Sequence, residues 1–217
     1  MARMSVEERR EALIEAAYRV IADHGVEGAT TRRVCAQANM PLASFHYAFE
    51  SRMALLTAVI DQAVPRRHTS LADEIREYTP AGDLPGDGLA GVEREVDQSL
   101  QALFLLIVKD PGRVHATMSL ALYSRQQEEL RKAGREMWQR LYELGTATLE
   151  SIAQRHGTNW SLPSEKLGPL LIAATNAVGM VYLTTTDEKQ TEQVIDAIKD
   201  WIMTYAVAAD ESDSSGE

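Results

Sequence analysis

Cysteine is nearly absent from this chain of 217 residues, because Cys35 is the single one. One cysteine excludes a disulfide within the chain and suits a reducing compartment. The opening residues, MARMSVEERR, are charged and lack the apolar stretch of a secretory signal. Together these absences predict a cytoplasmic protein.

Short motifs of catalysis and metal binding are also missing. The sequence contains no E-x-x-H or H-x-x-x-H pair, no G-x-x-x-x-G-K phosphate loop and no G-x-S-x-G nucleophile elbow. We therefore expect no catalytic residue, no metal and no cofactor. The five histidines lie far apart in sequence but could meet in space, so a helical enzyme stays an alternative.

Long apolar runs are scarce as well. The longest, residues 167–183, spans 17 residues and contains Pro169, Thr175 and Asn176. This run is short for a membrane-spanning helix, which needs about 20 apolar residues. We expect a buried helix here and no contact with a membrane.

Basic residues are in the minority. The 22 Lys and Arg against 32 Asp and Glu give a formal net charge of -10, which excludes a protein that is basic over its whole surface. Residues 1–56 hold seven residues of each sign, so the acidic excess lies beyond them. Residues 28–52 contain Arg32, Arg33 and Arg52 against Glu50 alone. The sequence predicts an acidic body with a neutral to basic head.

What the sequence does contain is a succession of helix signals. With 45% hydrophobic and 25% charged residues, the chain is long enough and apolar enough to fold around a core. Ser5 and Glu8 form a capping box, and Gly25 can end the first helix in a left-handed conformation. Between them, an apolar stripe at helical spacing is made by Leu13, Ala17, Val20 and Ile21.

Two short helices follow. Thr30 can cap a helix that extends through Ala38, and Asn39 tolerates the positive φ of a tight turn. Pro41 suits the first turn of a third helix, which we expect to end near Phe49.

The rest of the chain is also predicted to be helical. Ser51 can cap a fourth helix that runs toward Pro65, and residues 79–88 form the clearest loop. Further helices are expected at about 89–108, 112–125, 128–155, 164–185 and 188–208, with a loop at 157–163. A short strand in 181–186 is an alternative, and the acidic tail 210–217 is expected to be disordered.

Residues 28–56 have the pattern of a helix, a tight turn and a second helix. Val34, Cys35 and Ala38 share one face of the first, Phe45 and Phe49 form the inward face of the second, and Met40 fills the turn. The outward face is then made by Leu42, Ala43, Ser44, His46 and Tyr47. A slim helix start followed by polar and aromatic side chains is typical of a helix that enters the major groove of DNA.

This segment resembles the DNA-binding head of the TetR/AcrR family of bacterial regulators. The matching run reads G-A-T-T-R-R-V-C-A-Q-A-N-M, then S-F-H-Y-A-F, then E-S-R-M-A-L-L. The family usually reads T-x-x-x-I-A-x-x-A-G-V-S, then T/S-L/F-Y-x-H/Y-F, then x-S-K-x-x-L. The departures are Asn39 for the turn glycine, Pro41 for a serine, Leu42 for a polar residue, His46 for a tyrosine and Ala48 for a histidine or tyrosine.

The resemblance implies an all-α fold with a three-helix helix-turn-helix head at 1–50 and a helical regulatory and dimerisation domain at 51–209. It also implies DNA contacts near the starts of three helices, at Thr30, Thr31, Arg32, Leu42, Ala43, Ser44, His46, Tyr47 and Arg52. Because this recognition helix is less polar than usual, we expect base reading to rely on apolar contacts with thymine methyl groups.

The body is expected to supply a dimer interface and a ligand chamber. The apolar face of the last two helices predicts an interface at Ala173, Ala177, Met180, Val181, Ile198, Trp201, Ile202 and Tyr205, with an intramolecular core as the alternative. Bulky and mostly apolar residues predict a chamber at Phe104, His115, Met118, Tyr123, Trp138, Tyr142 and Asn176. Core packing is the alternative for each of these residues.

These observations predict a homodimeric transcriptional regulator of double-stranded DNA. In the resembling family such a protein is commonly a repressor that binds a near-palindromic operator and is released by a small molecule, here unidentified. A purely protein-binding helical module is the other alternative, in which residues 28–49 would be a packed helical hairpin.

Overall fold

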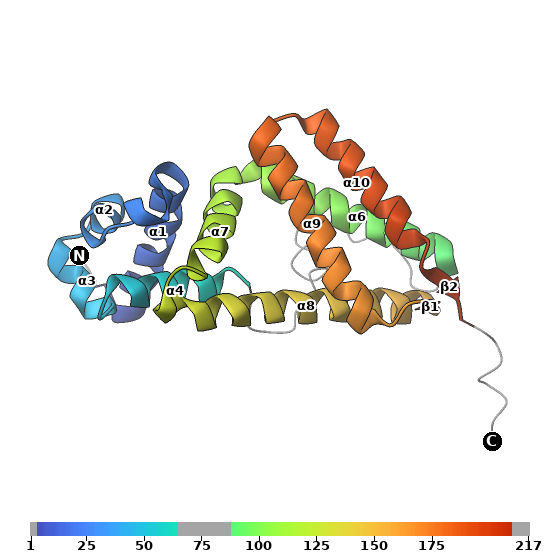
Figure 1. Cartoon of the computed structure of the whole chain (residues 1–217), viewed down its shortest axis with the longest axis horizontal. Helices are drawn as coiled ribbons and strands as arrows, with labels where there is room; N and C mark the ends of the chain where they lie inside the picture. The colour runs from blue at the N-terminus through green and yellow to red at the C-terminus, as the bar shows by residue number, and fades with distance from the viewer. Residues whose placement is uncertain (1–3, 65–87, 210–217) are drawn as a thin grey trace, which may run out of the picture. The chain divides into compact units, whose positions relative to one another are not determined.

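The computed structural model describes residues 4–64 and 88–209, which form an all-α fold as predicted (Figure 1). Pro65, almost all of the loop expected at 79–88 and the tail at 210–217 lie outside these residues. The helices are α1 (Val6–Gly28), α2 (Thr31–Gln37), α3 (Leu42–Ala48), α4 (Arg52–Gln62), α6 (Gly88–Lys109), α7 (Pro111–Ser124), α8 (Glu128–His156), α9 (Ser164–Thr185) and α10 (Glu188–Met203). Two short strands accompany them, β1 (Thr158–Trp160) and β2 (Ala206–Ala208).

The chain folds as two compact units. The first comprises Met1–Arg66 and Asp110–Arg140, so α7 and the first part of α8 pack with the head helices; the second comprises Arg67–Lys109 and Leu141–Glu217. The expected division into a DNA-binding head at 1–50 and a regulatory and dimerisation domain at 51–209 stays a prediction.

Local capping explains where the head helices begin. The Ser5 hydroxyl accepts a hydrogen bond from the Glu8 amide at 3.1 Å, and the Glu8 carboxylate accepts one from the Ser5 amide at 2.7 Å. Thr30 and Ser51 accept bonds in the same way from amides three residues ahead. Pro41 stands at the start of α3 without a side-chain bond.

The turns of the head use the residues that the sequence indicates. Gly25 interrupts α1 with φ 69°, and Asn39 has φ 52° between α2 and α3. Both values lie in the region that glycine and asparagine tolerate best. The chain therefore turns between α2 and α3 without a glycine at that position.

The core of the first unit lies where α1, α2, α3 and α4 meet. The predicted stripe on α1 is buried, with Leu13, Ala17 and Ile21 fully inaccessible. Cys35 is buried as well, and this burial raises the pKa of its thiol. A thiol that stays protonated is a poor nucleophile, so Cys35 acts as a small core residue.

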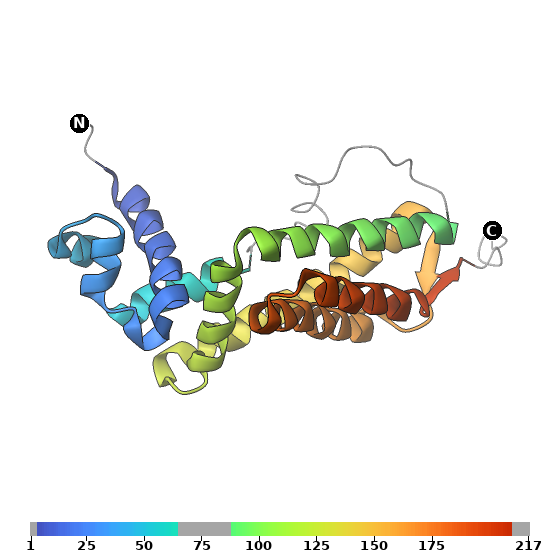
Figure 2. The ribbon, with the colours of Figure 1, turned by 90° about the horizontal axis from the view of Figure 1, so that it is seen from above.

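In the second unit, α10 packs on α9 and α6 (Figure 2). The strands pair antiparallel, with Thr158 opposite Ala208 and Trp160 opposite Ala206. The predicted loop at 157–163 therefore contains a strand, and the helix predicted to reach 208 ends at Met203. Three-residue strands are too short to show an alternating pattern in the sequence. Residues 181–185 continue α9, so the strand considered at 181–186 does not form.

Two glycines allow α8 and α9 to approach each other within this second unit. A Cβ atom added to Gly168 would lie 2.5 Å from the Thr146 amide nitrogen, and one added to Gly145 would lie 2.8 Å from the Gly168 carbonyl oxygen. Both positions therefore require the absence of a side chain. Pro169 lies inside α9, which begins at Ser164.

The expectation that 167–183 forms a buried helix is wrong in part. α9 has 22 residues, which by length and composition alone is enough to cross a membrane, but only 28% of its most apolar window is buried. Leu170 and Met180 are 47% and 63% exposed, and Ala173 and Ala177 are exposed beside them. The sequence shows that the helix is apolar on nearly all sides, but not which sides the rest of the chain covers.

Candidate nucleic-acid interface

The outward face of α3 is open to solvent. Tyr47 is 73% exposed and Leu42 43%, and Ala43 and His46 are exposed with Ser44 half-buried between them. This is the orientation that the sequence predicts for all five residues. The face is free to contact another molecule, while its contact with DNA stays a prediction.

The inward face of α3 fixes the helix on the head. Phe45 is fully buried, and the centre of its ring lies 5.8 Å from the centre of the Phe49 ring. Phe49 is 3% exposed. The turn before α3 is closed by a hydrogen bond of 2.8 Å from the Met40 amide to the Cys35 carbonyl. These contacts attach α3 to the rest of the head, although it has only seven residues.

Two arginines of α1 reach α3, and sequence reasoning missed both. Arg10 donates a hydrogen bond of 3.1 Å to the Ala48 carbonyl at the end of α3, and its guanidinium lies 4.3 Å from the centre of the Phe49 ring. The guanidinium of Arg9 lies 5.8 Å from the centre of the Tyr47 ring. They place positive charge beside the exposed face of α3, where it would favour a polyanion.

The start of α2 carries the other predicted phosphate contacts. Thr30 and Arg32 are exposed, and Thr31 is half-buried. The neighbouring Arg33 donates a hydrogen bond of 3.0 Å to the Gly28 carbonyl. These side chains lie at a helix start, where free amide groups favour anions, so the arrangement suits a phosphate.

Arg52 has a structural contact that the sequence did not indicate. Its Nε donates to the Ala29 carbonyl at 2.8 Å and its Nη2 donates to the Val26 carbonyl at 2.5 Å. The side chain thereby ties the start of α4 to the end of α1. A phosphate contact by Arg52 stays a prediction, and it would have to coexist with this role.

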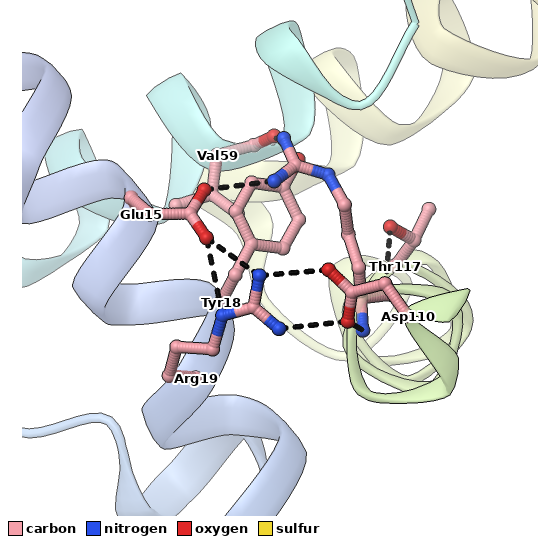
Figure 3. A network of polar contacts seen from close by, with 7 residues as sticks. Glu15, Tyr18, Arg19, Val59, Asp110 and Thr117 are labelled. Carbon is pink, nitrogen blue, oxygen red and sulfur yellow. Dashed lines mark hydrogen bonds and ion pairs between the residues drawn. The ribbon is translucent and has the colours of Figure 1, made fainter. Parts of the chain in front are cut away.

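A network of charged residues joins α1 to α7 within the first unit (Figure 3). Arg19 donates to both carboxylate oxygens of Asp110, each at 2.7 Å, and to Glu15 at 2.8 Å. Arg113 donates to the other oxygen of Glu15 at 2.8 Å, and its guanidinium lies 4.1 Å from the centre of the Tyr18 ring.

The same network reaches α4. The Tyr18 hydroxyl donates a buried hydrogen bond of 2.9 Å to the Val59 carbonyl. Asp110 also caps α7 by accepting a bond from the Arg113 amide at 3.0 Å. The positions of α1, α4 and α7 are therefore coupled through a few polar contacts.

The network predicts a dependence of stability on pH. The hydrogen bonds from Arg19 hold the pKa of Asp110 below its usual range. Burial raises the pKa of Glu15, but the bonds from Arg19 and Arg113 outweigh this and lower it overall. A lowered folded-state pKa gives stability that is present above the ordinary carboxyl pKa of about 4 and is lost as the pH falls through the folded value.

We therefore expect the free energy of unfolding to fall between about pH 5 and pH 3, and to fall less steeply in Asp110→Asn. The substitution keeps an N-cap side chain but removes the charge. Urea unfolding at a series of pH values measures both. Parallel profiles for the two proteins would show that Asp110 does not contribute.

The residues predicted for a ligand chamber are divided between the two units. His115, Met118, Tyr123 and Trp138 belong to the first, and Phe104, Tyr142 and Asn176 belong to the second. His115 is exposed, and the Asn176 amide donates to the Ile172 carbonyl of its own helix at 2.8 Å. Phe104 packs on Tyr182 with ring centres 6.1 Å apart. A single chamber lined by all seven stays a prediction.

The face predicted for dimerisation is hollowed. A groove of about 500 Å³ between α9 and α10 is lined by Leu170, Ala174, Gln190, Gln193, Val194, Ala197, Ile198 and Trp201. Ile202 is fully buried and Ile198 is 7% exposed, so both serve mainly the core of their own chain. The surface that a partner could contact is made by the other predicted residues, with Leu170 in addition.

Metal-ligating side chains do not gather in the part of the chain that the structure describes. Residues 4–64 and 88–209 hold no group of three or more His, Cys, Asp or Glu that could bind a metal ion.

Comparisons with known proteins agree with this geometry. Residues 13–59 match the family of bacterial regulatory proteins named tetR. No curated protein sequence matches the chain. A transcriptional regulator from Rhodococcus sp. Rha1 has a similar fold, with a TM-score of 0.68 at 17% identity over 92% of this chain and 98% of that one.

Two further solved structures share the fold. A TetR transcription regulator from Haloarcula marismortui superposes with a TM-score of 0.69 at 15% identity, covering 92% of this chain and 99% of that chain. The multidrug binding protein EbrR, solved in complex with imidazole, superposes with a TM-score of 0.55 at 21% identity, covering 88% and 94%. At these identities the likeness concerns the fold.

Proposed function

We propose that this chain, whose residues 13–59 match the bacterial regulatory proteins of the tetR family, is a transcriptional regulator that binds a specific duplex operator as a homodimer and is released from it by a small molecule. The observation that carries the proposal is the exposed outer face of α3, held in place by the buried Phe45 and Phe49. Cytoplasmic location and repression, the common mode in this family, belong to the same proposal.

In the proposed complex α3 lies in the major groove. Leu42 and Ala43 would contact thymine methyl groups, and Ser44 and His46 would exchange hydrogen bonds with base edges. Tyr47 would reach the sugar–phosphate backbone at the groove margin. Thr30, Thr31, Arg32 and Arg52 would hold phosphates, which positions the head without reading sequence.

A dimer gives this contact its specificity. Two copies related by a two-fold axis would place their recognition helices about 34–36 Å apart, one turn of DNA, so the operator would be a near-palindrome. The exposed apolar groove between α9 and α10 supports pairing through this face, because a monomer rarely leaves such a surface open.

Release by an effector requires two states of different DNA affinity. Ligand and DNA would each weaken the binding of the other by the same factor. The contacts that support a link are those of Tyr18 with Val59 and of Arg19 with Asp110, which join α1 to α4 and to α7. A shift of α4 or α7 would therefore displace α1, and α2 and α3 pack against α1.

The experiment that tests DNA binding is its dependence on salt. For a duplex selected by the wild-type protein from a random pool, the logarithm of affinity should fall by about 0.9 per logarithm of salt concentration for each phosphate contacted. Arg32→Ala should reduce this slope, whereas Ser44→Ala should change the preference among sequences and leave the slope alone. A protein-binding module would show no steep slope, and that result would reject the proposal.

A further inference from the structure

The guanidinium of Arg140 on α8 has hydrogen-bond donors that find no acceptor among the described residues. Its Nε and Nη2 are buried and have no hydrogen-bond partner among the residues that the structure describes. Among the described residues, Asp61 on α4 forms an ion pair with Arg140, with its Oδ1 at 3.6 Å from Nη2, which is beyond hydrogen-bond distance. Both residues belong to the first unit.

The two unused nitrogens form one edge of the guanidinium. Nε–H and Nη2–H point the same way and are spaced to match the two oxygens of a carboxylate. The same chain shows the filled arrangement in its second unit, where Arg155 donates from Nε to one oxygen of Glu95 at 3.1 Å and from Nη2 to the other. The corresponding edge of Arg140 has the same donor geometry and could pair with a carboxylate in the same way.

The surroundings of these two donors are apolar on α8. Met137 and Ala133, which precede Arg140 by about one and two turns on the same face of α8, are 2% and 6% exposed. A buried donor without an acceptor is destabilising, and more so when it is charged. Native proteins retain few such groups, so each one needs a physical explanation.

We propose that Arg140 anchors the effector, and that the effector is a small carboxylic acid with an apolar body. This rests on the proposed function, since it identifies the chemical class of the releasing molecule. The carboxylate pairs with the Nε and Nη2 edge, and the apolar part packs on α8 next to Arg140. Because the bound anion neutralises Arg140, Asp61 loses its attraction to it, and the hold between α8 and α4 weakens.

The test uses the full-length protein with two pairs of probes. Octanoate and 4-phenylbutanoate carry the carboxylate on an aliphatic and an aromatic body, and their primary amides are neutral controls of the same shape. Acetate tests charge without the apolar body. Binding is measured by calorimetry and by the rise in thermal midpoint, which a ligand of the native state produces by mass action.

The variants separate the anchor from general charge. Arg140→Gln removes the charge, Arg140→Lys keeps the charge but not the paired edge, and Arg135→Gln is the matched control at an exposed position of the same helix. Circular dichroism establishes that each variant is folded. If Arg140→Gln does not fold, Arg140→Lys alone decides, since it still lacks the edge.

We expect at least one carboxylate to bind the wild type and the Arg135→Gln control with equal affinity, and its amide and acetate to bind at least tenfold more weakly. Arg140→Gln and Arg140→Lys should lose about tenfold to a hundredfold in affinity for the carboxylate. Equal binding of acid and amide, equal binding by the Arg140 variants, or no binding of either acid overturns the proposal.

Operator binding is measured in the same samples so that the two proposals can fail separately. If the salt slope is steep but neither acid binds, DNA binding stands and the anchor is rejected. If an acid binds through Arg140 without lowering operator affinity, the carboxylate site stands and its role as the effector site is rejected. A loss of operator affinity on adding the acid, absent in Arg140→Gln, supports both.

Discussion

Replacing Leu42 with glutamate is expected to reduce operator affinity at least about a hundredfold in each half-site. Leu42 is the first residue of α3 and is 43% exposed, so the substitution should leave the core of the head intact. A carboxylate there would face the DNA backbone from inside the major groove. Repulsion from one phosphate at about 6 Å, with an effective dielectric constant of about 20, is about 3 kcal/mol, which corresponds to about a hundredfold.

Fluorescence anisotropy with the duplex selected by the wild-type protein measures this effect. Leu122→Glu is the matched control, because Leu122 is 76% exposed on α7 and makes no part of the proposed interface. The control should bind within a few-fold of wild type, since one added surface charge is screened by salt. If both variants bind alike, α3 does not enter the groove, and the proposed mode of DNA binding fails.

Replacing Ala177 with glutamate is expected to convert the proposed dimer into a monomer at micromolar concentration. Ala177 lies exposed on α9, between the exposed Ala173 and Met180. This side of α9 adjoins the groove between α9 and α10. A two-fold interface would bury the new charge twice, without a partner of opposite sign. Burying an unpaired carboxylate costs several kcal/mol, which is enough to separate an interface of ordinary size.

Sedimentation equilibrium measures the oligomeric state, and the same samples should lose more than about a hundredfold in operator affinity, since each head would then bind alone. Ala90→Glu is the matched control, an identical change at an exposed position on α6. It should remain dimeric. A dimer that survives Ala177→Glu would place the interface elsewhere on the molecule.

The head shows why much of this protein could be predicted from its sequence. Ser5, Thr30 and Ser51 cap helices through amides three residues away, and Asn39 sets a turn through its own backbone. Each of these interactions is local, so residues that are close together in the sequence determine it. The exposed face of α3 follows in the same way, because Phe45 and Phe49, four residues apart, must point inward together.

What the tertiary structure decided are the contacts between residues that are distant in sequence. Arg19 meets Asp110 across 91 positions, and Arg10 meets Ala48 across 38. The sequence shows that Arg10, Arg19 and Asp110 are charged, but it does not show which distant group each of them contacts. The division of the expected ligand residues between two units and the pairing of β1 with β2 depend on the path of the whole chain in the same way.

Composition and spacing therefore determined that the chain is helical, where most helices begin and which side of α3 faces outward. Only the folded chain decided that one side of α9 stays open and that Nε and Nη2 of Arg140 lie buried near Asp61, without a hydrogen-bond partner among the described residues. The physical reason is range: capping and helical periodicity act over four residues or fewer, whereas burial and charge pairing depend on which distant elements pack together.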